Sequence, residues 1–104
     1  RAAGLMLSGE KISSFEAEKI GMIYKTVDDE NGYQETYDYA KKISEMPTKS
    51  IGLIKSLLSK SNSNSISEQL ELEKKYQITA ANSKDHKEGV KAFFEKRKPK
   101  YIGE

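Results

Sequence analysis

Only one stretch of the chain, residues 22–27, has the character of a β-strand, and a single short strand has no partner with which to form a sheet. We therefore expect that stretch to be an extended connector. Elsewhere the apolar spacing and the residues at segment ends are those of helices. The sequence predicts an all-α fold, a small bundle of about five to six helices.

The strongest helix-start signal is the capping box Ser13-x-x-Glu16, in which a serine hydroxyl and a glutamate carboxylate each satisfy a backbone amide of the other residue. The helix that it starts is predicted to run to Ile20. Gly21 then follows, and glycine suits the left-handed position just past a helix end.

Similar signals delimit the other expected helices. The spacing predicts a second capping box at Ser65 and Glu68. Pro47 ends one apolar pattern, and Asp85 is placed to cap the last helix, which Pro99 ends. A polar serine and asparagine loop occupies residues 61–65. The expected helical segments are residues 1–7, 33–46, the apolar stripe over 51–58, 66–81 and 85–97.

The composition is lean for an independent core. Of the 104 residues, 36% are hydrophobic and 33% are charged, so a partner surface or a covalent staple is expected to help the fold. There is no cysteine, which excludes disulfides and cysteine-ligated zinc. The single histidine, His86, cannot build a metal cluster, and we expect it to be solvated or at a helix end.

The common catalytic motifs are missing. The sequence has no glycine-rich phosphate loop, no nucleophile elbow and no metal-ligand spacing, and its pairs of acids are typical of solvated helix faces. We therefore expect no catalytic residue, no metal and no cofactor in this chain. No apolar run approaches the roughly 20 residues of a membrane span. Arg1 in place of an initiator methionine suggests the middle of a longer protein, and a reducing, cytoplasmic location is expected.

A basic cluster lies near the C-terminus, over residues 95–100. Nucleic-acid binding would need a larger basic surface and a recognition helix, neither of which the sequence offers. Cations at a helix C-terminus interact favourably with the helix dipole, and this is the preferred interpretation. No nucleic-acid partner is expected.

Phe93, Lys96 and Arg97 would share one side of a helix, because residues three and four apart are neighbours there. An aromatic ring beside two cations suits a nucleotide, with the ring on the base and the cations on phosphate. The alternative is that Phe93 and Phe94 are core anchors covered by cationic side chains. Spacing and composition alone favour the core alternative.

The order of motifs resembles that of the enoyl-CoA hydratase/isomerase (crotonase) family. The segment from Leu5 to Val27 is similar to the family pattern "ltG..isA.eA...GLV..V", and residues 47–58 and 67–77 are similar to the two patterns that follow it. The run from Asp85 to Pro99 is the most specific, because it reads D-x-x-E-G-x-x-A-F-x-E-K-R-x-P, as in the family. The resemblance covers essentially the whole chain.

The resemblance implies a place in a larger fold. In the family, a core of repeated ββα turns holds the oxyanion-hole amides and the proton-transferring acids, and a C-terminal helical region packs on that core and on neighbouring subunits. Residues 1–104 would be this C-terminal helical, oligomerising domain, with the catalytic core upstream of residue 1. The intact protein is then expected to hydrate or isomerise acyl-CoA thioesters, in the breakdown of fatty acids or aromatic acids, as a trimer or hexamer.

The resemblance also assigns ligand contacts. The family's helical region contributes to the CoA site of an adjacent subunit, and the matching residues here are Phe93 and Lys96, against adenine and phosphate. Acyl-CoA would be a substrate and not a cofactor. A further family aromatic would fall near Gln77, where this chain departs from the pattern, unless Tyr76 replaces it.

A different class of protein remains as an alternative. The chain could be a self-standing helical module that binds a partner protein through the apolar stripe between Ile51 and Leu58, without enzymatic activity. A naturally truncated family member with a scaffolding role lies between the two. The extent of the reading frame upstream of Arg1 distinguishes them.

Overall fold

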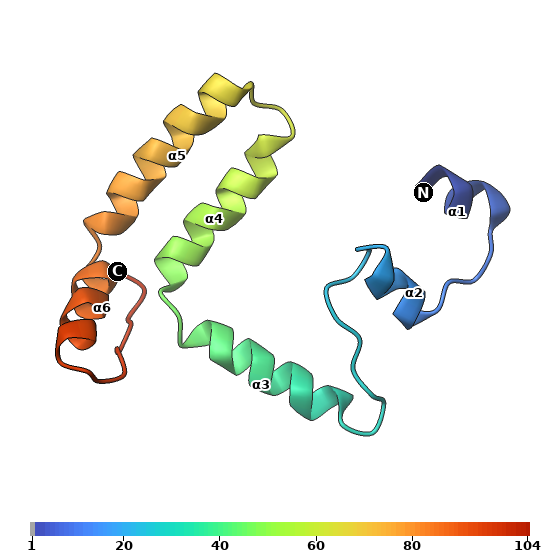
Figure 1. The fold of residues 1–104 in the computed structure, drawn as a ribbon, viewed down its shortest axis with the longest axis horizontal. Coiled ribbons are helices and arrows are strands. Elements are labelled where there is room, and N and C mark those ends of the chain that lie inside the picture. Colours follow the sequence, from blue (N-terminus) through green and yellow to red (C-terminus); the bar gives the residue numbers. More distant parts are fainter. Residues whose placement is uncertain (1) are drawn as a thin grey trace. The chain divides into compact units, whose positions relative to one another are not determined.

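In a computed structural model, residues 2–104 are described, and within them the chain forms six helices and no strand (Figure 1). The all-α prediction is therefore confirmed, and residues 22–27 form an irregular connector. The helices are α1 (Ala2–Ser8), α2 (Ser14–Lys19), α3 (Gly32–Ser44), α4 (Thr48–Ser61), α5 (Ile66–Ala81) and α6 (Lys84–Phe94).

The chain divides between Tyr37 and Asp38 into two compact units. In the first unit, the predicted capping box is present at the start of α2, where the Glu16 amide donates to Ser13 Oγ at 3.2 Å and the Ser13 amide donates to Glu16 Oε2 at 3.2 Å. The helix ends as expected at Gly21, whose φ of +77° is left-handed. The domain boundaries 1–104 remain a prediction.

The second unit is built on an antiparallel pair, α4 and α5, which lie side by side (Figure 1). The second capping box, Ser65 with Glu68, starts α5 as predicted. Between the helices, Ser56 Oγ and Tyr76 Oη form a hydrogen bond of 3.0 Å. This bond couples the middle of one helix to the last turns of the other.

The last helix, α6, starts and ends differently from the prediction. Its N-cap is Ser83, whose hydroxyl accepts from the His86 amide at 3.0 Å, and Asp85 lies inside the first turn. The helix ends at Phe94 and does not reach Arg97. The helical backbone stops at the C-cap residue Glu95, because the next residue, Lys96, has a left-handed φ of +52°. The chain therefore turns before it reaches Pro99.

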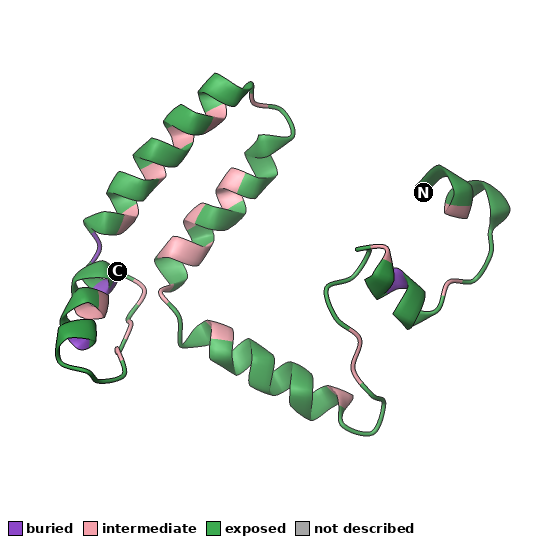
Figure 2. Cartoon of the chain, in the orientation of Figure 1, coloured by how far each residue is buried: buried purple, intermediate pink, exposed green. Residues whose placement is uncertain are grey.

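Few of the described residues are buried (Figure 2). Among the described residues, the buried apolar side chains are those of Ala17 and Ala92, and the buried polar ones are those of Ser83 and Asp85. Two alanines are far too small to supply a conventional hydrophobic core. The helices therefore keep wide apolar faces uncovered, as the lean composition predicts.

Candidate functional site

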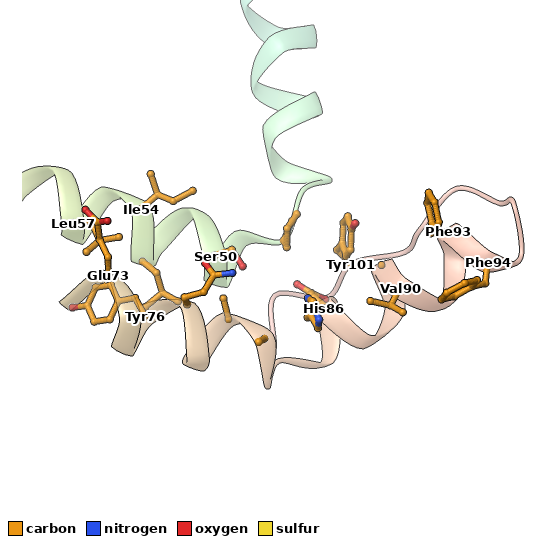
Figure 3. Close-up of a pocket in the computed structure, with 17 residues that line it drawn as sticks. Ser50, Ile54, Leu57, Glu73, Tyr76, His86, Val90, Phe93, Phe94 and Tyr101 are labelled. Carbon is orange, nitrogen blue, oxygen red and sulfur yellow. The ribbon is translucent and has the colours of Figure 1, made fainter. Parts of the chain in front are cut away.

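The candidate site is a groove in the second unit, with a volume of about 820 Å³. It runs from the α4–α5 pair to the far end of α6, and the C-terminal segment adds Tyr101 (Figure 3). Ile54, Leu57 and Tyr76 line one end, and Phe93 and Phe94 line the other. The wall is largely apolar.

The two phenylalanines at the end of α6 form an edge-to-face pair with ring centroids 5.7 Å apart. Phe93 is 79% exposed and Phe94 is 78% exposed, so neither ring is a core anchor within the described chain. The core alternative for Phe93 stays a prediction, because other large apolar side chains of the chain, such as Met6 and Leu7, are as exposed as this ring. An exposed ring at the rim of a groove is available to a planar ligand.

Tyr76 and Gln77 lie where the family resemblance expects a further aromatic residue, one helix before α6. Both residues line the groove, but the Tyr76 hydroxyl is bonded to Ser56, and this hydrogen bond lowers the pKa of the Tyr76 phenol. Tyr76 is half-buried, whereas Gln77 is exposed. The bond to Ser56 ties the Tyr76 ring to α4.

Lys96 lies just past α6, in the left-handed region, with φ of +52°. The Lys96 amide donates to the Phe93 carbonyl at 3.3 Å, and the Arg97 amide donates to the Ala92 carbonyl at 3.1 Å. These two bonds define a Schellman motif, in which the left-handed position usually belongs to glycine. The expectation that Phe93, Lys96 and Arg97 share one helical face is therefore wrong, because only Phe93 is helical.

Arg97 turns back onto α6 instead. Its guanidinium forms two parallel bonds with Glu88, Nη1 to Oε1 at 2.6 Å and Nη2 to Oε2 at 2.9 Å, and its Nε donates to Glu95 at 2.6 Å. The Arg97 guanidinium, with help from the Lys100 amide, lowers the pKa of Glu88 to about 2. Bidentate pairs of this kind fix geometry as well as charge.

Two further cations near this end of α6 have carboxylate partners. Lys98 Nζ lies 2.9 Å from Glu45 Oε2, and Lys91 Nζ lies 3.9 Å from Glu95 Oε1. Lys96 makes no ion pair with any residue in 2–104. Its ammonium is therefore free to bind an anion from outside the chain.

Sequence reasoning missed the residues that hold the C-terminal segment. The buried Asp85 carboxylate accepts from the amides of Ile102, at 2.7 Å, and Gly103, at 2.9 Å. A side chain at Gly89 would meet the Tyr101 ring, since an added Cβ would lie 3.2 Å from Tyr101 Oη. In the sequence, these residues were marked only by the family-like pattern from Asp85 to Pro99, which does not reveal what each residue contacts.

Most of the side chains that line the groove are apolar or aromatic. No group of three or more metal-ligating side chains occurs in residues 2–104. His86 is exposed, and its backbone amide closes the N-cap of α6. None of the helices described is long and apolar enough to cross a membrane. What the site presents is a largely apolar groove with the exposed ring of Phe93 at one end, and Lys96 follows three residues later in the turn after α6.

Comparison with known proteins places the chain in a family. The profile of the enoyl-CoA hydratase/isomerase family matches residues 1–104. The chain is 40% identical, over 103 residues, to the 1,2-epoxyphenylacetyl-CoA isomerase of Escherichia coli, covering 99% of the chain and 39% of that protein. It is 31% identical to the trans-2-decenoyl-[acyl-carrier-protein] isomerase of Streptococcus mutans, covering 99% of the chain and 39% of that protein.

Solved structures agree. An enoyl-CoA hydratase from Bacillus anthracis matches with a TM-score of 0.92 and 31% identity, over 100% of this chain and 40% of that one. An enoyl-CoA hydratase from Mycobacterium marinum matches with a TM-score of 0.89 and 26% identity, over 99% and 41%. The chain thus spans about two fifths of the length of these relatives. On this evidence, the chain belongs to the enoyl-CoA hydratase/isomerase family.

Proposed function

We propose that residues 1–104 are the C-terminal helical domain of an enzyme that acts on acyl-CoA thioesters by hydration or double-bond isomerisation. The domain supplies oligomer contacts and one edge of the CoA site, while the catalytic groups belong to the rest of the protein. The observation that carries the proposal is the family match over the whole chain, combined with coverage of only about two fifths of its relatives.

The names of the relatives support a thioester substrate. The Escherichia coli relative is named for an aryl-acetyl-CoA compound, and the Streptococcus mutans relative for a decenoyl group on acyl-carrier protein. An acyl thioester is common to both. The chemistry that fits such substrates is stabilisation of a thioester enolate by backbone amides, with proton transfer by carboxylates.

The proposed CoA contacts are Phe93 and Lys96. Phe93 offers an exposed ring to adenine, and Lys96 offers an ammonium without an intramolecular partner to phosphate. The fold does not depend on the Phe93 ring or the Lys96 ammonium, because the buried Ala92 and the Glu88–Arg97 ion pair already hold this end of α6.

The oligomer contacts are proposed for the uncovered apolar faces. Ile54 and Leu58 on α4 are 54% and 66% exposed, and such apolar area in a soluble protein usually marks an interaction surface. In the intact protein these faces would meet the catalytic core or a neighbouring subunit, in a trimer or hexamer. The alternative of a self-standing interaction module uses the same faces but leaves the family match unexplained.

The first test is the reading frame upstream of Arg1. A frame that extends by the length of a catalytic core supports the proposal, and a frame that starts close to Arg1 overturns it. The purified 104-residue chain itself is expected to be inactive on crotonyl-CoA. Turnover above the buffer blank, after controls for host enzyme, would place catalytic groups within these residues.

The second test addresses Lys96 in the full-length protein. Lys96→Ala should raise the KM for acyl-CoA about three- to fivefold and leave kcat nearly unchanged, because the contact is remote from the reacting carbons. The effect should shrink as ionic strength rises. Lys98→Ala is the matched control, since Lys98 is already paired with Glu45. An unchanged KM in Lys96→Ala would remove Lys96 from the site.

A further inference from the structure

The Glu88 carboxylate on α6 makes three of the bonds that hold the turn carrying Lys96, beside the two Schellman bonds and the bond from Arg97 Nε to Glu95. Glu88 binds the guanidinium of Arg97, the residue directly after Lys96, through two bonds of 2.6 and 2.9 Å. The same carboxylate accepts the backbone amide of Lys100 at 2.8 Å. Glu88 therefore holds the chain at Arg97 and at Lys100, which lie one and four residues beyond Lys96.

Lys96 needs such a restraint. Its φ of +52° is unfavourable for any residue with a Cβ, and it is the one positive φ outside glycine in residues 2–104. Residues of this kind stay in place only when their surroundings hold them, and they gather at functional sites. The Schellman bond from the Arg97 amide to Ala92 depends on where Arg97 is held.

We propose that Glu88 is a positioning residue for CoA binding, which acts through Arg97 to hold the turn that carries Lys96 directly after the groove-lining end of α6. This inference rests on the proposed contact between Lys96 and CoA. Glu88 does not touch the ligand in this scheme. Its carboxylate selects the left-handed turn, and the turn aims the lysine.

The sign of the effect separates positioning from simple electrostatics. CoA carries phosphates, so removal of a nearby negative charge strengthens its binding if charge alone matters. Loss of positioning weakens binding instead. Glu88→Gln keeps the size and an acceptor for the Lys100 amide but removes the charge that holds Arg97, so the two explanations predict opposite changes in Kd.

The experiment is a cycle of variants in the full-length protein, with the Kd for CoA measured by calorimetry at low ionic strength. We expect Glu88→Gln to raise the Kd about threefold in the wild-type background and to have no effect in the Lys96→Ala background. Glu71→Gln is the matched control, because Glu71 is an exposed acid on α5, outside the turn. Glu71→Gln should leave the Kd within error.

Each result has a distinct meaning. If Lys96→Ala leaves the Kd unchanged, the proposed CoA contact fails. If Lys96→Ala weakens binding while Glu88→Gln strengthens it, leaves it unchanged, or weakens it equally in both backgrounds, the contact stands and the positioning role is overturned. Should Glu88→Gln fail to fold, Arg97→Lys replaces it. Arg97→Lys keeps the charge and loses the bidentate geometry, so a raised Kd that vanishes in the Lys96→Ala background supports positioning, and any other result contradicts it.

Discussion

Gly21 and Lys96 occupy the same position in two copies of one helix-ending motif. At the end of α2, the Gly21 amide donates to Glu18 at 2.9 Å and the Met22 amide donates to Ala17 at 2.8 Å. At the end of α6, Lys96 and Arg97 repeat these bonds to Phe93 and Ala92. The first copy uses the residue that tolerates a positive φ at no steric cost, and the second uses a lysine.

Lys96→Gly is therefore expected to stabilise the chain. A left-handed φ costs a residue with a Cβ about 1–2 kcal/mol. The greater freedom of glycine in the unfolded chain returns about 0.4–1 kcal/mol of this, so we expect a net gain of about 0.5–1 kcal/mol. Urea denaturation followed by circular dichroism would measure the gain. The same variant should lose the CoA contact of the full-length protein, which a purely structural lysine would not do.

Gly21→Ala is the control for this prediction, because an added Cβ at Gly21 meets no atom within 4 Å. The strain of a φ of +77° is then the main change, and α2 should lose stability. A Lys96→Gly variant that is less stable than wild type would show that the Lys96 side chain contributes more to the fold than its backbone strain removes.

Asp85→Asn is expected to release the C-terminal segment. The side-chain amide can accept from only one of the Ile102 and Gly103 backbone amides, and its NH₂ group opposes the other, so a part-buried donor loses its partner. Such a loss typically costs about 1–3 kcal/mol. Hydrogen exchange at Ile102 and Gly103 should become faster. Ser83→Ala, which removes the N-cap at a typical cost of about 1 kcal/mol, should lower stability and leave these two amides protected.

The Glu88–Arg97 pair predicts a defined pH dependence. The folded pKa of Glu88 is about 2, below its ordinary value of 4.5, so the pair's contribution is complete above pH 4.5 and is lost as pH falls toward 2. Other acids titrate in the same range. The measurement is therefore the difference in melting temperature between wild type and Glu88→Gln, which should narrow from pH 5 to pH 2. A difference that does not change with pH would contradict the lowered pKa.

The exposed apolar face of α4 predicts self-association of the isolated chain. Leu58→Glu should shift the sedimentation distribution toward monomer, because Leu58 is 66% exposed and a charge there opposes apolar contact. Ser59→Glu introduces the same charge at the adjacent exposed position and should have a smaller effect. A wild-type chain that remains a compact monomer over a wide concentration range would argue against an uncovered interface on α4.

Short sequence motifs, each spanning only a few residues, predicted most helix ends correctly. The capping boxes at Ser13 and Ser65 and the glycine stop at Gly21 appear as expected, since each depends on bonds between residues three to five apart. Pro47 likewise lies between α3 and α4. These features follow from backbone geometry that the local sequence alone selects.

The end of α6 was not predictable in this way. Helical spacing extended the helix to Arg97 and placed Lys96 beside Phe93, because cations and phenylalanine are all compatible with a helix. The reversal instead requires Glu88 to hold Arg97 nine residues later and Asp85 to hold amides 17 and 18 residues later. No local signal identifies such partners.

The sequence by itself determined the all-α fold, the start of α2 and α5, and the family, because these depend on short-range backbone bonds and on the order of residue types along the chain. Only the tertiary structure decided the contacts and the exposure of the residues from Asp85 to Arg97. It showed that Asp85, Glu88 and Arg97 hold the C-terminal segment, and that Phe93 is exposed and Lys96 unpaired. The physical reason is that a side chain's partner is set by where the chain returns in space, and that return is encoded by several long-range bonds acting together.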